Sequence, residues 1–337
     1  MIVEEFRDKK ILITGGTGSL GKALVKRLYP FTKNITIYSR DEGKQALSFI
    51  QYPEIKKVLG DIRDRERTFS VFSKEKPDFV IHAAALKRID DLELSPEECI
   101  KTNIQGSINV ADAAMNAFVK KCILVSTDKA CTPVNVYGAS KFTAERIFTN
   151  KDYEQTRTIF SSVRYGNVIA SRGSFIPHWL ELGGQDKPVP VTSLQCTRFL
   201  FTLTDAVNTV LSSLIQSEGG EVFVPCFDSF NMDTVLKATG NLLGSELDHF
   251  EVGMRPGEKF HEDMVAALEL SHTYWSEMLE GLQTPHCNRL LKILPQYSNR
   301  FRTLGKKYKG PEINSQNWLN SDVGYLTGLI KSGLEDE

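Results

Sequence analysis

The sequence contains no run of about eighteen apolar residues, the length that a transmembrane helix needs, so it predicts no membrane-spanning segment. A signal peptide is not expected either, because the chain starts Met-Ile-Val-Glu-Glu and has no apolar core before the first predicted strand. A large excess of one charge is also absent: 41 Lys and Arg face 42 Asp and Glu, for a formal net charge of -1. This balance gives no electrostatic basis for nucleic acid or an anionic membrane as the main partner.

Paired cysteines are missing too. The six cysteines are spread through the chain, and none forms a Cys-x-x-Cys motif. We therefore expect reduced, mostly structural thiols in a cytoplasmic protein. The six histidines are equally scattered, so no zinc or other metal site is expected.

The sequence does contain a strand, a glycine-rich turn and a helix in direct succession. An apolar strand is predicted at residues 9–14, a Gly-x-x-Gly-x-x-Gly turn follows at 15–21, and an amphipathic helix at 22–28. Gly15 allows a tight turn, Gly18 lets the backbone approach a pyrophosphate at the helix N-terminus, and Gly21 lets the helix pack on the strand. A second strand at 34–38 favours a dinucleotide site over a glycine-rich loop without a ligand.

The end of the second strand distinguishes NAD from NADP. An acidic residue there would bind the ribose 2′-hydroxyl of NAD. The chain has Ser39 and Arg40 instead, whose hydroxyl and guanidinium suit a 2′-phosphate. Asp41 and Glu42 come slightly too late and are expected to face solvent. The sequence therefore favours NADP.

Two further strands are expected to contribute to the cofactor site. Asp61 closes a third short strand, where a carboxylate commonly accepts from the adenine amino group, although a turn aspartate explains it equally well. A fourth strand at 79–82 is followed by the small residues 83–85, a floor for the cofactor. Lys87 lies near the expected phosphate or sugar hydroxyls, with a solvated lysine as the alternative. Asn103, on a helix, is expected to brace the active-site strand.

An acid–base pair, Asp128 and Lys129, follows a short apolar strand at 122–125. Downstream, Tyr137 and Lys141 are four residues apart at a predicted helix, so they share one face. A lysine beside a tyrosine favours the phenolate, which can take a proton from a hydroxyl while a hydride leaves the same carbon. Simple dehydrogenation has no use for a second acid and a second base, whereas dehydration does.

The second half of the chain is less regular. A strand is predicted at 158–164, a helix at 203–216 and a strand at 221–224, but the alternation fades from about residue 175. The part after about residue 271 is expected to be polar and irregular. Arg172, Arg198 and Arg255 offer cations for a substrate diphosphate, although each alone is more often a surface residue.

Together these segments resemble the extended short-chain dehydrogenase/reductase superfamily. Within it, the chain is similar to the soluble, 5-inverting UDP-N-acetylglucosamine 4,6-dehydratases that open pseudaminic acid biosynthesis. The resemblance covers about residues 9–264, and its specific parts are Thr-Asp-Lys, Arg-Tyr-Gly-Asn-Val and Arg-Pro-Gly-Glu-Lys. The matching segments are residues 15–22, 38–42, 82–87, 126–130, 134–138, 164–168, 171–177, 197–199 and 255–261.

The resemblance implies an α/β fold, a Rossmann-type doubly wound parallel sheet with a smaller C-terminal substrate domain. The NADP-binding domain would span residues 1–166, with 200–225 returning to it, and the substrate-binding domain 167–199 and 226–337. The implied enzyme is an NADP-dependent lyase and a homo-oligomer, dimer or hexamer. It would convert UDP-N-acetylglucosamine to UDP-2-acetamido-2,6-dideoxy-4-keto-hexose with inversion at C5.

The resemblance also implies residue roles. Thr127 would hold the region of the sugar 4-hydroxyl, and Tyr137, aided by Lys141, would take the hydroxyl proton as hydride passes from C4 to NADP. Lys129 would remove the C5 proton and Asp128 would protonate the departing C6 hydroxyl, before hydride returns to C6. The expected cofactor contacts are Gly15, Thr17, Gly18, Ser19, Leu20, Gly21, Ser39, Arg40, Lys44, Asp61, Ile62, Ala83, Lys87, Tyr137, Lys141 and Val168. The expected substrate contacts are Lys87, Thr127, Asn167, Arg172, Arg198, Arg255 and Glu258.

The chain departs from the family pattern at Ala170, where glycine is usual, at Cys226, where lysine is usual, and after Leu268. Alternatives therefore stay open. They are a C5-retaining dehydratase, a dehydratase of another nucleotide sugar such as a GDP-sugar, a nucleotide-sugar 4-epimerase, and a non-catalytic NADP-binding sensor. An epimerase would need no Asp128–Lys129 pair.

Overall fold

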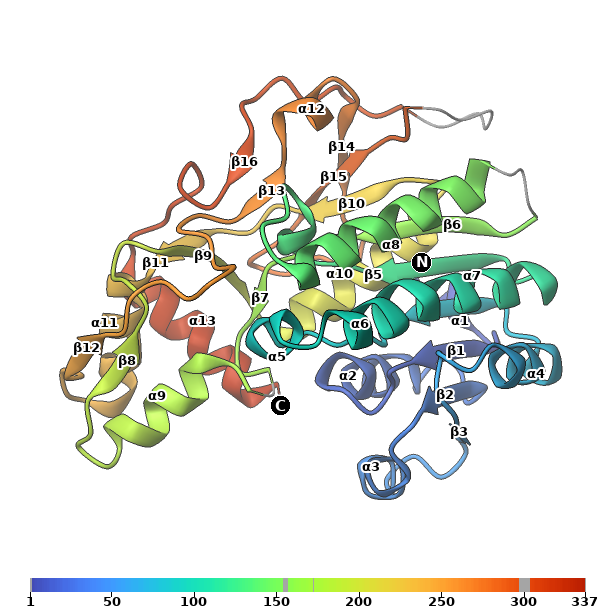
Figure 1. Cartoon of the computed structure of the whole chain (residues 1–337), viewed down its shortest axis with the longest axis horizontal. Coiled ribbons are helices and arrows are strands. Elements are labelled where there is room, and N and C mark those ends of the chain that lie inside the picture. Colours follow the sequence, from blue (N-terminus) through green and yellow to red (C-terminus); the bar gives the residue numbers. More distant parts are fainter. Residues whose placement is uncertain (1, 154–156, 172, 297–303, 337) are drawn as a thin grey trace.

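The computed structural model describes residues 2–153, 157–171, 173–296 and 304–336. Its largest feature is a nine-strand sheet with the order β14-β15-β10-β6-β5-β4-β1-β2-β3 (Figure 1). The strands from β10 to β3 are parallel, and β15 and β14 extend the sheet antiparallel beyond β10. The strands are β1 (Ile11–Thr14), β2 (Ile35–Ser39), β3 (Lys56–Leu59), β4 (Phe79–His82), β5 (Lys121–Val125), β6 (Ile159–Val163), β10 (Val222–Pro225), β14 (Thr273–Glu277) and β15 (Arg289–Ile293).

Helices cover both faces of this sheet, as parallel strands buried on both sides require. Successive strand residues point to opposite faces, so Ile13 packs with Val210 of α10 on one side and Leu12 with Phe148 of α8 on the other. The α/β Rossmann-type fold expected from the sequence is thereby confirmed. The helical elements here are α1 (Ile2–Phe6), α2 (Ser19–Leu28), α3 (Glu42–Ser48), α4 (Arg65–Glu75), α5 (Ile89–Glu93), α6 (Pro96–Cys99), the π-helix η1 (Ile100–Gln105), α7 (Gly106–Asn116), the 3-10 helix η2 (Asp128–Ala130), α8 (Val136–Tyr153) and α10 (Leu203–Gln216).

A smaller lobe with its own apolar core lies beside the large sheet (Figure 1). Trp179, Val235 and Leu326, from three helices, meet in this core. Its small sheets have the orders β11-β9-β7 and β12-β8. The elements are β7 (Asn167–Val168), α9 (Phe175–Gly183), β8 (Val189–Val191), β9 (Thr197–Phe201), β11 (Ser229–Asn231), α11 (Met232–Leu243), β12 (His249–Glu251) and α13 (Val323–Glu335). A further pair, β13 (Asp263–Val265) and β16 (Ile313–Asn314), packs with β10 and β15 of the large sheet, and α12 (Ala267–Leu270) follows β13.

The chain passes between the large sheet and the smaller lobe more than once. After β7 and β9 in the lobe, α10 and β10 return to the large sheet. β14 and β15, from the range 226–337, also pair into the large sheet. The division of the chain into domains at residues 166, 199 and 225 stays a prediction.

The expectation of a polar, irregular C-terminal part is wrong. Residues after 271 form β14, β15 and the thirteen-residue helix α13. The signal for α13 was present in the sequence, because Leu326, Leu329 and Ile330 recur at helical spacing and are buried. Asp322 caps the helix by accepting from the backbone N–H of Tyr325.

Candidate active site

The glycine-rich turn joins β1 to α2 and has a shape that excludes side chains at two positions. Gly15 has a φ of +68°, and a Cβ there would lie 2.7 Å from Cα of Ala84. A Cβ on Gly21 would lie 2.4 Å from Cα of Gly16, so α2 packs directly against the turn. The N-cap, Gly18, supplies no side-chain cap to the N–H groups of α2. This helix terminus fits the pyrophosphate of a dinucleotide, with Thr17, Ser19 and Leu20 in the same turn.

The end of β2 presents a cation at the surface. The guanidinium of Arg40 is about half exposed (54%) and lies 3.6 Å from Asp61. Ser39 is more constrained, because Nε2 of Gln45 donates to its hydroxyl at 2.8 Å. Gln45 was not among the predicted residues. Lys44 pairs with Asp41 at 2.6 Å, so its ammonium is partly neutralised.

Asp61 follows β3 in a turn. Its carboxylate accepts from the backbone N–H of Arg63 at 3.0 Å and from Nε of Arg63 at 2.9 Å. Burial raises the pKa of Asp61, but the hydrogen bonds from Arg63 outweigh burial and hold the pKa below its ordinary value. These contacts are those of a turn aspartate, and its contact with adenine stays a prediction. The neighbouring Ile62 is buried against Gly106.

The backbone after β4 runs beside the glycine turn. The N–H of Ala83 donates to the carbonyl of Thr14 at 3.2 Å. Asn103, in η1, bonds both the N–H and the carbonyl of Leu86, at 2.8 and 3.0 Å, and donates to the Ser140 hydroxyl at 3.0 Å. Asn103 therefore ties the segment after β4 to α8. Lys87 is exposed at the end of this segment.

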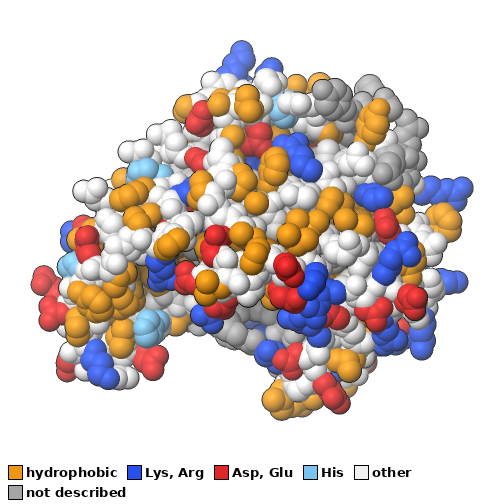
Figure 2. All heavy atoms as spheres, in the orientation of Figure 1, with side chains coloured by type: hydrophobic (Ala, Val, Ile, Leu, Met, Phe, Trp, Pro, Cys, Tyr) orange, Lys and Arg blue, Asp and Glu red, His pale blue; other side chains and the backbone are white. Residues whose placement is uncertain are grey.

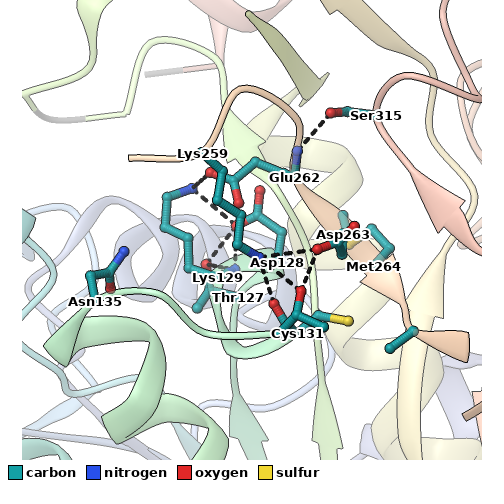
Figure 3. A network of polar contacts seen from close by, with 12 residues as sticks. Thr127, Asp128, Lys129, Cys131, Asn135, Lys259, Glu262, Asp263, Met264 and Ser315 are labelled. Carbon is teal, nitrogen blue, oxygen red and sulfur yellow. Dashed lines mark hydrogen bonds and ion pairs between the residues drawn. The ribbon is translucent and has the colours of Figure 1, made fainter. Parts of the chain in front are cut away.

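The acid–base pair lies in η2, directly after β5. Asp128 is fully buried, and its Oδ1 accepts from Oγ1 of Thr127 at 2.8 Å and from Nζ of Lys129 at 3.1 Å. The Lys129 amine also lies 3.2 Å from Oε1 of Glu262, which precedes β13. Figure 3 shows the amine of Lys129 between the two carboxylates. Oδ2 of Asp128 and Oε2 of Glu262 are buried without a hydrogen-bond partner among the described residues.

The charges of this cluster are coupled. Burial raises the pKa of Asp128 above its ordinary value, with Lys129 opposing and Glu262 adding to the rise. For Lys129, burial lowers the pKa, but Asp128 and Glu262 outweigh burial and leave the pKa raised. The two carboxyl groups therefore favour the charged form of Lys129, while burial disfavours the charged form of Asp128.

Tyr137 and Lys141 lie four residues apart within α8, as the motif predicts. Burial raises the pKa of Tyr137 to about 12, although Lys129 and a hydrogen bond with Thr127 lower it. Burial lowers the pKa of Lys141 to about 8, against the charge of Glu145. The expectation that Lys141 favours the phenolate of Tyr137 is wrong, because burial raises the pKa of Tyr137 and the strongest charge that opposes this rise is Lys129.

A buried ion-pair network stabilises the segments around the Asp128–Lys129 pair. The guanidinium of Arg164, 1% exposed, pairs with Glu145 at 2.7 Å and with Glu269 at 2.9 Å. Glu145 also accepts from the hydroxyl of Ser126 at 2.5 Å, at the end of β5. The network joins α8, the end of β6 and α12 around the segment that carries the acid–base pair.

The expected substrate residues occupy different surroundings. Asn167 and Val168 form β7, and Oδ1 of Asn167 is buried without a partner in the described part of the chain. Arg198, in β9, donates to the carbonyls of Thr197 and Phe260 and is near enough to Lys129 to lower the lysine pKa. Arg172 lies outside the described residues.

The last pair of expected substrate residues lies on a loop beside α5. Arg255 is 55% exposed and pairs with Asp90 of α5 at 3.1 Å. Its backbone N–H donates to Glu258 at 3.2 Å. Asn135 donates to the carbonyl of Gly257 at 2.7 Å, so the loop is attached to the start of α8, two residues before the tyrosine.

Sequence reasoning missed Glu262. It directly follows the Arg-Pro-Gly-Glu-Lys-Phe-His segment, but nothing in the sequence places it against Lys129. Thr127, Asp128, Lys129 and Tyr137 do come together as expected from their spacing.

The face drawn in Figure 2 is hollowed between the lobe that carries α9 and the part that carries α2 and α3.

Within the described ranges, no helix is long and apolar enough to cross a membrane. The same ranges hold no group of three His, Cys, Asp or Glu side chains that could bind a metal ion.

Comparison with known proteins identifies close relatives. The model of a polysaccharide biosynthesis protein family matches residues 11–280. The chain is 45% identical over 310 residues to UDP-N-acetylglucosamine 4,6-dehydratase (inverting) of Campylobacter jejuni subsp. jejuni serotype O:23/36 (strain 81-176), with 90% of each chain covered. It is 38% identical over 275 residues to UDP-glucose 4-epimerase of Rickettsia felis, covering 79% of this chain and 80% of the relative. Among solved structures, Pen from Bacillus thuringiensis has a TM-score of 0.86 and 31% identity, with 98% of each chain covered.

Proposed function

The chain belongs to the polysaccharide biosynthesis protein family, and we propose that it is a nucleotide-sugar 4,6-dehydratase that acts on UDP-N-acetylglucosamine and inverts C5. The 45% identical Campylobacter jejuni relative, named for this activity, supports the substrate and the stereochemistry. The observation that carries the reaction class is the buried contact of Asp128 with Lys129, beside Tyr137. Elimination of water needs an acid and a base in addition to the groups that oxidise C4.

In the proposed reaction, the side chains of Tyr137, Lys129 and Asp128 carry out the proton transfers. Tyr137 takes the proton of the 4-hydroxyl, held in place by Thr127, while Lys141 contributes positive charge from the same helix. The resulting ketone acidifies C5. Lys129 passes its own proton to the Asp128 carboxylate, 3.1 Å away, and the neutral amine then takes the C5 proton. Asp128 gives its proton to the C6 hydroxyl, which leaves as water. A dinucleotide held at the glycine-rich turn at residues 15–21 would supply the hydride chemistry, taking hydride from C4 and giving it back at C6.

We propose NADP as the dinucleotide. The uncapped N-terminus of α2 and the crowded Gly15 turn fit a pyrophosphate. The exposed guanidinium of Arg40, beside Ser39, suits a 2′-phosphate better than an uncharged hydroxyl. Lys44, Asp61, Ile62, Ala83, Lys87 and Val168 complete the proposed cofactor contacts.

The proposed nucleotide-sugar contacts come from segments that are far apart in the chain. Arg198 and Arg255 supply positive charge for the diphosphate, and Arg172 is proposed for the same role from the sequence. Asn167 offers a buried oxygen that has no hydrogen-bond partner within the described ranges. Lys87, Thr127 and Glu258 complete this set. A cytoplasmic location and a homo-oligomer are proposed as well, the first because all six cysteines are free thiols.

A nucleotide-sugar 4-epimerase is the second candidate, favoured by the 38% identity to the Rickettsia felis relative. Epimerisation needs Tyr137 and Lys141 but has no step for the Asp128–Lys129 pair. The pair is buried and hydrogen-bonded as a unit, which favours dehydration. The same assay separates a dehydratase of a GDP-sugar and a non-catalytic NADP-binding sensor. A C5-retaining dehydratase is distinguished by the proton coupling constants around C5 of the product.

The test is to incubate the purified protein with UDP-N-acetylglucosamine and to weigh the product by mass spectrometry. Loss of one water supports a dehydratase. An isomer of unchanged mass supports an epimerase, and turnover of a GDP-sugar alone would change the substrate assignment. No reaction with any nucleotide sugar, despite bound NADP, would favour the sensor.

A further inference from the structure

The two catalytic pairs of the candidate site lie on different elements. Asp128 and Lys129 belong to η2, and Tyr137 and Lys141 belong to α8. In the proposed reaction both pairs act on one sugar, because Tyr137 takes the proton of the C4 hydroxyl and Lys129 takes the C5 proton. A displacement of about 1 Å between reacting groups can cost about 100-fold in rate. Contacts that join η2 to α8 therefore bear on catalysis.

The backbone that enters η2 is attached to the end of β6. The N–H of Ser126 donates to the carbonyl of Val163 at 2.7 Å, and the N–H of Asp128 donates to the carbonyl of Tyr165 at 2.9 Å. Arg164 lies between these two acceptors, and its side chain is 1% exposed. Arg164 is thus held directly beside the chain that carries the acid–base pair.

All five N–H groups of the Arg164 guanidinium have acceptors. Nε and Nη2 donate to the two carboxylate oxygens of Glu145 at 3.2 and 2.7 Å. Nη1 and Nη2 donate to the two oxygens of Glu269 at 2.9 and 3.0 Å, and Nη1 also donates to the carbonyl of Met264 at 2.8 Å. A guanidinium has five donors in a fixed planar arrangement, so these bonds leave Arg164 and its two carboxylates little freedom to move.

Each of the two carboxylates contacts one end of the acid–base segment, residues 127–130. Ser126, directly before the segment, donates its hydroxyl to Oε1 of Glu145 at 2.5 Å. Cys131, directly after the segment, has its Sγ 3.8 Å from Oε2 of Glu269. The hydroxyl contact is the stronger of the two, because a thiol is a weak donor. One guanidinium therefore holds the acid–base segment at both ends through its carboxylate partners.

Glu145 also connects the acid–base segment to the catalytic side of α8. It follows Lys141 by four residues and Tyr137 by eight, so the three side chains succeed one another along one side of the helix. The hydroxyl of Ser126 is thus a side-chain link between the start of the acid–base segment and the helix that carries the tyrosine.

We propose that Ser126 is a positioning residue, whose hydroxyl sets the spacing between the acid–base segment and Tyr137 through Glu145. The inference rests on the proposed dehydratase function. Without the hydroxyl, Ser126 would keep its backbone bond to Val163, but the acid–base segment would lose its link to α8. Removal of the C5 proton by Lys129 should then slow, while oxidation of C4 at Tyr137 should not.

The test compares Ser126→Ala with the wild type in a single turnover of UDP-N-acetylglucosamine deuterated at C5, with NADP bound. Absorbance of the reduced cofactor reports the C4 step, and mass spectrometry of the loss of C5 deuterium reports the action of the base. In Ser126→Ala, cofactor reduction and KM should stay within about threefold of the wild type. The rate of deuterium loss should fall about 10- to 100-fold.

A purely structural defect would give a different result, because a loss of folded protein lowers the amplitudes of both signals and changes neither rate. Ser161→Ala is the matched control. It removes a hydroxyl that is buried in β6 and has no hydrogen-bond partner among the described residues, so both rates should stay unchanged. Ser126→Thr keeps a hydroxyl beside Glu145 and should keep the wild-type rate of deuterium loss.

The proposal would be overturned by an unchanged rate of deuterium loss in Ser126→Ala, or by an equal fall of both rates. The same slow deuterium loss in Ser161→Ala or in Ser126→Thr would also overturn it. If Ser126→Ala does not fold, Cys131→Ala tests the other end of the acid–base segment. Deuterium loss should there fall relative to cofactor reduction, by a smaller factor, and an unchanged ratio of the two rates would overturn the proposal.

These outcomes are separate from the failure of the proposed function. A wild type that releases water from the sugar, with no effect of Ser126→Ala on deuterium loss, would leave the dehydratase assignment intact and remove only the role of Ser126. A wild type that releases no water from the sugar would refute the proposed function, and this inference with it.

Discussion

At the scale of single residues, the candidate site depends on ionisable side chains whose state is set by burial and by neighbours. Burial alone would neutralise Lys129, but two carboxylates keep its pKa raised. Burial raises the pKa of Tyr137 to about 12, and the strongest charge that opposes this rise is Lys129. One lysine therefore influences both the acid–base pair and the tyrosine that receives the first proton.

Lys129→Ala should block deuterium entry at C5 and still permit hydride transfer from C4. Since Lys129 lowers the pKa of Tyr137, its loss should raise that pKa, and hydride transfer should require a higher pH than in the wild type. NMR of C5 exchange and absorbance of the reduced cofactor against pH measure the two effects. Lys259→Ala, which removes a cation paired with Asp263, is the control and should keep C5 exchange. Normal exchange in Lys129→Ala would refute the base assignment.

Arg40→Ala should weaken NADP binding by about 10- to 100-fold, the effect of losing a hydrogen bond to a charged group worth about 1.5–3 kcal/mol. NAD, which has no 2′-phosphate, should lose little affinity. Titration of both dinucleotides by calorimetry gives the ratio. Arg63→Ala is the matched control, because Arg63 pairs with the same carboxylate, Asp61, at 2.9 Å. An equal loss for NADP and NAD in Arg40→Ala would exclude the 2′-phosphate contact.

At the scale of elements, the sequence predicts the bounds of helices and strands best where the hydrophobic pattern and the capping residues agree. The strand at 79–82 and the helix at 203–216 have the predicted bounds. The helix is preceded by a capping box of Thr202 and Asp205, which marks its start. Ala170, where a glycine is usual in the family, has a φ of +58°, a left-handed conformation that favours glycine. The π-helix η1 has no comparable sequence signal, because it depends on what its residues contact.

Asn103→Ala tests the role of η1. The substitution leaves the N–H and carbonyl of Leu86 without their partner. The hydroxyl of Ser140 loses one hydrogen bond and keeps its bond to the Tyr137 carbonyl. Buried groups left unpaired cost about 1–3 kcal/mol each, so we expect the free energy of unfolding to fall by about 2–4 kcal/mol. Urea denaturation measures it. Lys101→Ala, on the exposed side of η1, should change stability by less than about 0.5 kcal/mol. A similar small change in Asn103→Ala would show that η1 is held by other contacts.

At the scale of the whole molecule, the site depends on contacts between segments that are far apart in the chain. Glu262 meets Lys129, and Arg164 meets Glu269, although the partners of each pair are distant in the sequence, 105 residues apart for Arg164 and Glu269. Motif spacing could predict that Thr127, Asp128 and Lys129 act together, because they are adjacent in sequence. It could not predict their distant partner, because that contact is a property of the fold.

Arg164→Ala should destabilise the whole protein. Removing one member of a buried ion pair leaves uncompensated charge and costs about 3–5 kcal/mol, and here two carboxylates, Glu145 and Glu269, lose the cation. Thermal and urea unfolding should both record the loss. Lys237→Ala, which breaks an exposed pair with Asp233 on α11, should cost less than about 1 kcal/mol. A comparably small effect of Arg164→Ala would mean that the network does not hold the sheet and α12 together.

The most direct test of the proposed reaction is an NMR time course of the wild-type protein with UDP-N-acetylglucosamine deuterated at C4, in H2O. The account predicts a 4-keto product that has lost one water and has the C4 deuterium on its C6 methyl group. Coupling constants around C5 should show inverted configuration from the earliest spectra. A product of unchanged mass, or one without deuterium at C6, would contradict the dehydratase mechanism. Early accumulation of only the C5-retained ketone would contradict the inverting assignment.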